Sequence, residues 1–451
     1  MKRAFLYLVI LTIITSISLQ ISSAADVKVR HTIIAASGDA APAGGNYSPF
    51  SFSNVSLNAR HEVAFDAGVG VTTGVFVGDG KTTSTISLGS ATHPFITPNG
   101  DVVFDVNDSD TYRSNGKSIV SLVRSGDTAP GGGTLTPLVG SHTTNDNGAI
   151  AYSAFVSDST ATQGIFRSDG LETIAIARDD INAPTGGSFT LLANPVINDR
   201  GQVAFYSNMT GGTADFGIFR GEGQDLTPIF VTNQIAPGGG TFSDFGDPVI
   251  NSHGQIATTV SLTNSDIGIF VGDGTDTVAI ALQGQPAPKG GNYKGQFIIP
   301  TRLNDQGEVA FDARLTGGTS SSGIFRGDGK RTTPIAIGGT NAPGTTGTFA
   351  SFRDFQLLND GRVAFIATLT PGVGGVNASN NTGIWIGTSD EDLQLVVRTG
   401  DIIEGKVLTR LPQAGQGTQL DINENSVLWV GTFGTAKAIV LSRLLGDNDE
   451  Q

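Results

Sequence analysis

The chain of 451 residues contains no cysteine, which excludes disulfide bonds and metal sites built on thiolates. After the first 25 residues, no stretch shows the 3.6-residue hydrophobic period of an amphipathic helix. No later hydrophobic run reaches the roughly 18 residues that a membrane-spanning helix requires. These absences argue against a helical protein, a disulfide-stabilised protein and a protein whose mature chain spans a membrane.

Glycine and proline, by contrast, are plentiful. The sequence has 62 glycines and 18 prolines together with many threonines and serines, while only 15% of the residues are charged. This composition suits many short strands joined by tight turns. The sequence therefore predicts an all-β fold.

The first 25 residues have a character of their own. Lys2 and Arg3 precede the apolar run AFLYLVILTIITSISL, and the small residues Ser22–Ala25 follow it. A basic start, an apolar run and small residues are typical of a signal peptide. We predict a cleaved signal peptide at residues 1–25 and a single domain at residues 26–451, secreted or periplasmic. An uncleaved membrane anchor is the alternative interpretation.

The mature chain is strongly acidic. Without Lys2 and Arg3, 25 of the 27 basic side chains remain against 41 acidic ones. Such a surface repels nucleic acid and anionic membranes, so neither is expected as a partner. It tolerates cations and neutral sugars. We expect a monomer.

A repeat of about 50 residues organises the chain. Ser188–Gly240 and Thr241–Gly291 follow the same plan. Each unit reads as four strands, exemplified in order by Thr241–Ile250, Gln202–Tyr206, Gly217–Arg220 and Pro228–Thr232. Four antiparallel strands per unit at this spacing favour a β-propeller over a solenoid.

The repeat occurs eight times. Aligning the second strands of the units gives Phe65, Phe104, Tyr152, Phe205, Thr258, Phe311, Phe365 and Trp429. An eight-bladed β-propeller is therefore predicted. Because the second unit is short, a seven-bladed ring in which this unit merges with a neighbour is the alternative.

The two ends of the repeat region complement each other. His31–Ala36 matches a fourth strand with nothing before it, whereas Lys406–Leu411, Val427–Val430 and Ala438–Leu441 match the first three strands without a fourth. We expect the N-terminal strand to complete the last blade and thereby to remove the exposed edges of the sheet.

A short motif recurs between the first and second strands. Asn198–Phe205 (NDRGQVAF) and Asn304–Phe311 (NDQGEVAF) match NxxGxxAF in full, while Asn58–Phe65 carries His61 in place of glycine. Here the chain resembles the bacterial tandem-repeat family named for this motif and for its varied C-terminal anchors. The resemblance covers nearly all of the mature chain and implies a secreted or surface-attached protein of undefined activity. The last segment, LSRLLGDNDEQ, departs from that pattern, so we expect no C-terminal anchor.

Motifs that carry chemistry are missing. The chain has no G-x-S-x-G, H-E-x-x-H or P-loop motif, and its five histidines are scattered. The recurring aspartates, such as Asp199 and Asp273, lie in predicted hairpin turns, where they bond to the backbone. A calcium ion needs about six converging oxygens, which no single loop offers. We predict neither a metal nor a cofactor.

A ligand site is expected where the repeat breaks its own rules. In a propeller, the loops between the second and third strands and those between units share one face, here called the long-loop face, and Thr368–Thr382 is its longest loop. The unusual residues leading inward from this face combine aromatic rings with charged groups, which suits recognition of sugars. The predicted ligand-binding residues are Tyr47, Asp66, Asp244, Tyr293, Lys294, Asp312, Arg353 and Asp354. Ordinary rim residues are the competing interpretation.

Two functions fit these observations. The preferred one is a non-catalytic propeller that binds a glycan or a protein at the long-loop face. The alternative is a polysaccharide hydrolase or lyase that uses carboxylates of the same face, which for a hydrolase must lie about 5–9 Å apart. Asp244 and Asp354 are the better pair, because Asp66 and Asp312 are expected to face each other across the central channel.

Overall fold

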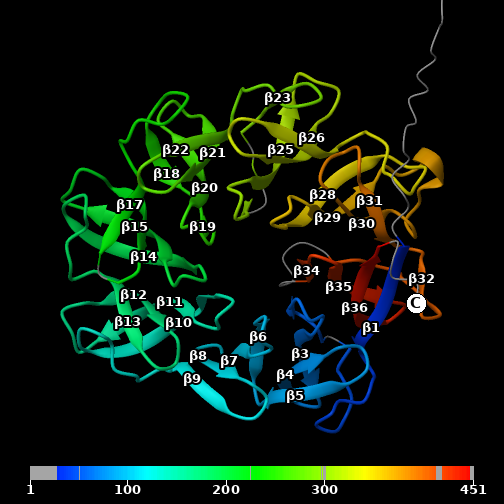
Figure 1. Ribbon diagram of the computed structural model, residues 1–451, viewed down its shortest axis with the longest axis horizontal. Coiled ribbons are helices and arrows are strands. Elements are labelled where there is room, and N and C mark those ends of the chain that lie inside the picture. Colours follow the sequence, from blue (N-terminus) through cyan, green and yellow to red (C-terminus); the bar gives the residue numbers. More distant parts are fainter. Residues whose placement is uncertain are drawn as a thin grey trace, which may run out of the picture.

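The structure is a computed structural model that describes residues 28–49, 51–223, 225–295, 297, 301–412 and 419–446. Eight antiparallel blades form a ring, which is an eight-bladed β-propeller (Figure 1). This result confirms the predicted fold, and the seven-bladed alternative is wrong. Within the described ranges there is no α-helix, and a single 3-10 turn, η1, spans Val373–Gly375. The predicted signal peptide lies outside the described residues.

The blades follow one another along the chain, and in blades 1 to 7 the strands run outward from the central axis in chain order (Figure 1). Blades 1 to 4 contain β2 Val55–Leu57, β3 Val63–Val69, β4 Thr72–Gly78 and β5 Thr83–Leu88; β6 Ala91–Ile96, β7 Val102–Val106, β8 Asp110–Ser114 and β9 Ile119–Val123; β10 Thr134–Thr144, β11 Ile150–Ser157, β12 Gln163–Ser168 and β13 Thr173–Arg178; β14 Ser188–Ile197, β15 Val203–Thr210, β16 Phe216–Gly221 and β17 Leu226–Val231.

In blades 5 and 6 the innermost strand consists of two pieces, each paired with the same neighbour. Blades 5 to 7 contain β18 Phe242–Phe245, β19 Val249–Ile250, β20 Ile256–Leu262, β21 Ile267–Gly272 and β22 Thr277–Leu282; β23 Asn292–Tyr293, β24 Arg302–Leu303, β25 Val309–Thr316, β26 Ser322–Gly327 and β27 Thr332–Ile337; β28 Phe349–Leu357, β29 Val363–Leu369, β30 Thr382–Gly387 and β31 Gln394–Arg398.

Blade 8 joins the two ends of the repeat region. From the axis outward it contains β34 Leu420–Asn423, β35 Ser426–Phe433, β36 Ala436–Leu445 and finally β1 Lys28–Ala36. Strand β1 is antiparallel to β36, with Ile33 opposite Val440 and Ala35 opposite Ile439. The predicted closure of the ring by the N-terminal strand is confirmed.

One strand of the last blade differs from the prediction. The innermost strand is β34, and the segment Lys406–Leu411 instead contributes β33 Lys406–Val407, which pairs with β32 Ile402–Ile403 in a small hairpin. Arg410 then forms an isolated bridge with Thr432 of β35. The inner strands of several blades are interrupted by bulges, so a pattern match to the first half of such a strand misses the second half.

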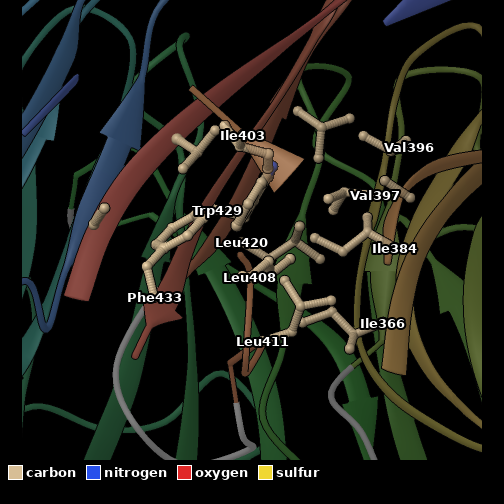
Figure 2. Close-up of a cluster of buried hydrophobic side chains, with 14 of the residues drawn as sticks. Ile366, Ile384, Val396, Val397, Ile403, Leu408, Leu411, Leu420, Trp429 and Phe433 are labelled. Carbon is tan, nitrogen blue, oxygen red and sulfur yellow. The ribbon is translucent and has the colours of Figure 1, made fainter. Parts of the chain in front are cut away.

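The hydrophobic core lies within and between adjacent blades. Figure 2 shows the cluster that joins blades 7 and 8, where Trp429 of β35 packs beside Leu408 and Leu420 and near Ile384 of β30. All eight aligned second-strand residues are buried, from Phe65 to Trp429. Burial of a large apolar side chain contributes about 1.5–3 kcal/mol, so this position stabilises seven of the blades, and blade 5 has the buried Thr258 there.

The motif asparagines join the blades at the short-hairpin face, which is opposite the long-loop face. Asn145 donates to the carbonyl of Asn198 at 2.9 Å, Asn251 donates to that of Asn304 at 3.0 Å, and Asn423 of blade 8 donates to Asn58 of blade 1 at 2.9 Å. The oxygens of these side chains also accept N–H groups of their own turns. The motif is therefore both a turn signal and a contact between blades.

Candidate functional site

Two of the predicted ligand-binding residues belong to the core. Tyr47 and Tyr293 are each 3% exposed. The ring of Tyr47 lies 5.2 Å from that of Phe76, and the ring of Tyr293 lies 5.4 Å from that of Phe325, both edge-on. Burial raises the pKa of Tyr47 to about 12, with the charge of Asp39 adding to the effect. Because each ring packs inside its own blade, it cannot stack on a ligand, and the prediction that these tyrosines bind one in this way is wrong.

Two predicted aspartates occupy equivalent buried positions in blades 1 and 6. Asp66 is 6% exposed and Asp312 is 9% exposed. The Asp66 carboxylate accepts the backbone N–H groups of Ser53 and Asn54 at 2.9 and 3.0 Å, and the Asn54 amide at 2.6 Å. Asp66 thus fixes the segment that leads into β2, rather than facing Asp312 across the channel as expected.

Asp244 and Asp354, the favoured catalytic pair, each contact a different residue. The carboxylate of Asp244 lies 3.5 Å from the hydroxyl of Tyr206 in blade 4, which donates to it. That of Asp354 lies 3.8 Å from the guanidinium of Arg302 in blade 6. Burial raises the pKa of Asp354, although Arg302 partly opposes this shift. No contact among the described residues joins Asp244 to Asp354.

The remaining two candidates are basic. The Lys294 side chain is exposed on blade 6, and Arg353 is half-buried on β28 of blade 7. Within the described part of the chain, no hydrogen bond or ion pair connects any two of the eight predicted residues. Of the eight, Asp66 is the one that lines a cavity described below.

A cavity of about 410 Å³ opens between blades 1 and 2. Its walls come from the segment before β2, the ends of β3 and β4 that adjoin the long-loop face, and the start of β6. Five of the eleven lining residues carry hydroxyl groups, and none is a lysine or an arginine. The lining residues are Ser48, Ser51, Phe52, Ser53, Asn54, Asp66, Ala67, Gly68, Thr73, Thr92 and His93. A cavity of this size, in which apolar surface is combined with a few polar groups, suits a small neutral ligand.

A second cavity, of about 310 Å³, lies between blades 7 and 8. It belongs to the short-hairpin face, and its charged lining residues are Arg362 and Asp392. Arg362 already donates to Asp360 and to the carbonyl of Glu424, and Asp392 caps its own turn at Thr388 and Ser389. These groups stabilise turns, so the cavity between blades 1 and 2 is the candidate site.

Behind this cavity, two histidines flank one buried carboxylate. His93 Nδ1 lies 3.4 Å from Oδ2 of Asp105, and His142 Nδ1 of blade 3 lies 3.7 Å from Oδ1. Asp105 is 2% exposed and also accepts the hydroxyl of Thr111 at 2.9 Å. The side chain of His93 is 47% exposed, whereas that of His142 is 14% exposed. One ring therefore reaches the cavity while the other is enclosed.

The pKa values of the two imidazoles are shifted in opposite directions. The hydrogen bond to Asp105 raises the pKa of His93 above its ordinary value, with smaller contributions from the charges of Asp105, Asp66 and Asp108. Burial lowers the pKa of His142, although Asp105 partly opposes the shift. His93 is thus the ring that gains a proton first as the pH falls.

The backbone places His93 at this position. Register shifts between Thr92 and Phe95 mark a bulge in β6, and His93 there has a φ of 50°, in the left-handed region. Phe52, across the cavity, has a φ of 69°. Non-glycine residues in this region are uncommon and cost of order 1 kcal/mol each. The bulge accounts for the position of His93 at the cavity.

This cluster has no clear signal in the sequence. His93 and His142 are 49 positions apart in units of different length, so they looked like two of five scattered histidines. The one signal in the sequence is Asp105, which follows the second-strand aromatic residue as Asp66 does. The described residues contain no group of three or more His, Asp or Glu arranged to hold a metal ion. They also include no helix of the length and apolarity that a membrane span requires.

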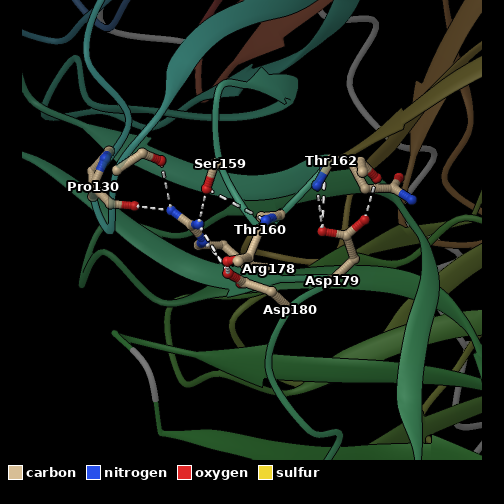
Figure 3. Close-up of polar contacts among 10 residues, drawn as sticks. Pro130, Ser159, Thr160, Thr162, Arg178, Asp179 and Asp180 are labelled. Atoms are coloured by element: carbon tan, nitrogen blue, oxygen red, sulfur yellow. Dashed lines mark hydrogen bonds and ion pairs between the residues drawn. The ribbon is translucent and has the colours of Figure 1, made fainter.

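The glycine-rich linkers on the long-loop face are structural. Figure 3 shows Arg178, whose guanidinium donates to the carbonyl of Pro130 at 2.6 Å and to the hydroxyl of Ser159 at 2.8 Å. It also pairs with Asp180 at 3.0 Å. Arg178 thereby holds the linker that enters blade 3 against the loop after β11. This linker presents the carbonyls of Pro130 and Gly132 to the arginine, which is a structural role.

Comparison with known proteins places the chain in a family. The model of a family described as "Family of unknown function (DUF7453)" matches residues 95–425. The chain belongs to this family. The match begins after the first blade, so the DUF7453 region contains His142 and Asp105 but not Asp66 or His93. No curated protein matches the chain.

Several solved propellers are similar to the DUF7453 chain. The β-propeller domain of the Trilobed protease from Pyrococcus furiosus is 13% identical, with a TM-score of 0.42, covering 79% of this chain and 98% of that one. The WD40 domain of SCAP from fission yeast is 9% identical, with a TM-score of 0.42 and coverages of 93% and 98%. Puromycin hydrolase is 10% identical, with a TM-score of 0.44 and coverages of 84% and 58%. None of the three bears on the chemistry of this chain.

Proposed function

We propose that this chain is a secreted, non-catalytic binding module and that the cavity between blades 1 and 2 holds a small neutral saccharide or one residue of a glycan. The cavity carries the proposal. Its volume of about 410 Å³ lies in the range of small-molecule sites. Its lining of serine and threonine hydroxyls, the Asn54 amide and the Asp66 carboxylate offers donors and acceptors of the kind that sugar hydroxyls require.

Charge favours a neutral ligand over an anionic one. Asp66 lines the cavity, Asp105 and Asp108 lie behind His93, and no lysine or arginine is present to balance them. A carboxylate or sulfate would therefore meet like charges in a partly dehydrated site. The Asp66 carboxylate is already held by three donors, which supports a role in binding rather than as a nucleophile.

A glycan array probed with the labelled mature chain tests the proposal. The array carries neutral, amino, uronate-containing and sulfated oligosaccharides. We expect signal on neutral oligosaccharides and none on the sulfated or uronate-containing ones. Binding confined to sulfated or uronate spots would contradict the proposal, and so would capture of a protein with no response to any sugar.

A further inference from the structure

We propose that His93 determines the specificity of the cavity between blades 1 and 2 by presenting the lone pair of Nε2 to the ligand. The cavity then selects a hydrogen-bond donor, such as a sugar hydroxyl, at this point. This inference rests on the proposed function, because it names the contact through which the cavity distinguishes one neutral ligand from another.

The first step is the position of the ring proton. Nδ1 of His93 lies 3.4 Å from Oδ2 of Asp105. A carboxylate can only accept, so the neutral ring carries its proton on Nδ1. His93 lines the cavity and its side chain is about half-exposed, and no hydrogen bond among the described residues involves Nε2. It therefore offers an acceptor to whatever enters.

The second step concerns the other groups that share Asp105. The hydroxyl of Thr111 donates to Oδ1 at 2.9 Å, and His142 lies 3.7 Å from the same oxygen. Oδ2 is thus left to His93. Because His142 is enclosed and burial lowers its pKa, it stays neutral and does not compete as a cation for the carboxylate.

The third step follows from the charges that face His93. These are Asp105 of β7, Asp108 after β7 and Asp66 of β3, and they favour a second proton on the ring as the pH falls, while His142 of β10 faces it as a neutral group. On doubly protonated His93, Nε2 becomes a donor. A hydroxyl can still accept from it, and so can an ether oxygen, which the neutral ring rejects. Selection for a donor therefore operates above the pKa of His93 and disappears below it.

The fourth step is that the backbone keeps the imidazole in place. Asn194 of blade 4 occupies the corresponding bulge of β14 with a φ of 53°, close to the 50° of His93. The bulge is thus a feature of more than one blade. The side-chain amide of Asn194 donates to Asp247 of the next blade at 2.6 Å, whereas His93 contacts Asp105 of its own blade. The same backbone geometry supplies a blade contact in one case and a cavity residue in the other.

Nuclear magnetic resonance on the full mature chain with nitrogen-15 in its histidine rings tests the proposal directly. We expect neutral His93 to carry its proton on Nδ1 and to titrate above His142. Asp105→Asn should lower the pKa of His93 and allow the neutral ring to carry its proton on either nitrogen. A proton on Nε2 of neutral His93 would overturn the proposal, whatever the cavity binds.

The ligand arm uses common neutral monosaccharides and their fully O-methylated forms as probes. The protein for this arm is uniformly labelled with nitrogen-15. Well above the His93 pKa found in the titration, the free sugars should shift the Nε2 signal and the backbone amide signals of Asn54 and Asp66, and the O-methylated forms should not. Well below that pKa, both kinds of sugar should shift them. His93→Asn, which suits the left-handed backbone as Asn194 does, should lose this pH-dependent discrimination at the backbone amide signals of Asn54 and Asp66. Unchanged discrimination in that variant would overturn the role of His93. Absence of any shift at Asn54 or Asp66 with every sugar would overturn the proposed function itself, and this inference with it.

Discussion

The side-chain amide of Asn198 donates a 2.9 Å hydrogen bond to the main-chain carbonyl of Asn251, its counterpart in the next blade. The side-chain oxygen of Asn198 also accepts the N–H groups of Arg200 and Gln202 in its own turn. One buried side chain thus closes a hairpin and fastens it to its neighbour. Repetition of this contact explains why the motif begins with asparagine.

Replacing this asparagine should therefore weaken the ring. Asn198→Ala removes these three hydrogen bonds and a fourth to the side chain of Gln202 at 2.9 Å, and it leaves buried backbone groups without partners. We expect a loss of about 2–3 kcal/mol in the free energy of unfolding. Asn359→Ala is the matched control, because Asn359 lies in the equivalent turn of blade 7 but is exposed. Its cost should be below about 1 kcal/mol. Denaturant unfolding gives both values, and equal losses would refute the special role of the motif asparagine.

A second prediction concerns the arginine that holds a linker. Arg178 is 5% exposed and donates to two carbonyls, a hydroxyl and Asp180. Lysine has no planar fork and would leave several of these acceptors unpaired, so Arg178→Lys should cost about 2–4 kcal/mol. Arg124→Lys, at the equivalent and exposed position of blade 2, should change stability by less than about 0.5 kcal/mol. Similar thermal shifts for the two variants would contradict this interpretation of Figure 3.

The buried tyrosine of blade 1 offers a test of its assignment to the core. The hydroxyl of Tyr47 is buried without a hydrogen-bond partner among the described residues. Removing it in Tyr47→Phe should leave stability unchanged or raise it by up to about 1 kcal/mol, whereas Tyr47→Ala should cost about 3–5 kcal/mol. Saccharide binding should be unaffected in Tyr47→Phe. A stable Tyr47→Ala protein that has lost binding would restore Tyr47 to the ligand site.

A pH prediction follows from Asp421 on β34. Burial raises its pKa to about 6, opposed in part by the N–H groups of Leu57 and Ile422 and by the charge of Arg302. Because the folded-state pKa lies above the unfolded value, the stabilising contribution is complete below about pH 4 and is lost as the pH rises through about 6. Asp421→Asn keeps an oxygen for the Leu57 N–H. Its free energy of unfolding relative to that of the native chain should rise by about 1–3 kcal/mol as the pH is raised from 4 to 8. Parallel stability profiles for the two proteins would exclude this shift.

Much of the architecture could be predicted from the sequence, because its signals are local and repeated. The turn asparagines, the second-strand aromatics and the unmatched strands at the two ends each depend on a few neighbouring residues. The innermost strand of blade 8 could not be predicted in the same way. The predicted segment Lys406–Leu411 contributes a hairpin strand paired with β32, and only the pairing with β35 shows that Leu420–Asn423 is the innermost strand.

The candidate site was harder to predict because it depends on pairing between blades. Asp66 was found, since it departs from the repeat at a fixed position. Tyr47 departs from the repeat too, but it fills its own blade, and sequence pattern does not distinguish an unusual core residue from an unusual surface residue. His93 and His142 meet at Asp105 only because adjacent blades bring β6, β7 and β10 together.

The most direct test of the central claim is saccharide binding by two matched variants. Thr73→Trp fills the cavity between blades 1 and 2, and Ser322→Trp places the same ring at the corresponding start of β26 in blade 6. We predict that titration calorimetry with an oligosaccharide found on the array will show at least about a tenfold loss of affinity for Thr73→Trp, which is about 1.4 kcal/mol, and an unchanged affinity for Ser322→Trp. Native affinity in a folded Thr73→Trp protein, or an equal loss in both variants, would contradict the assignment of the ligand site to this cavity.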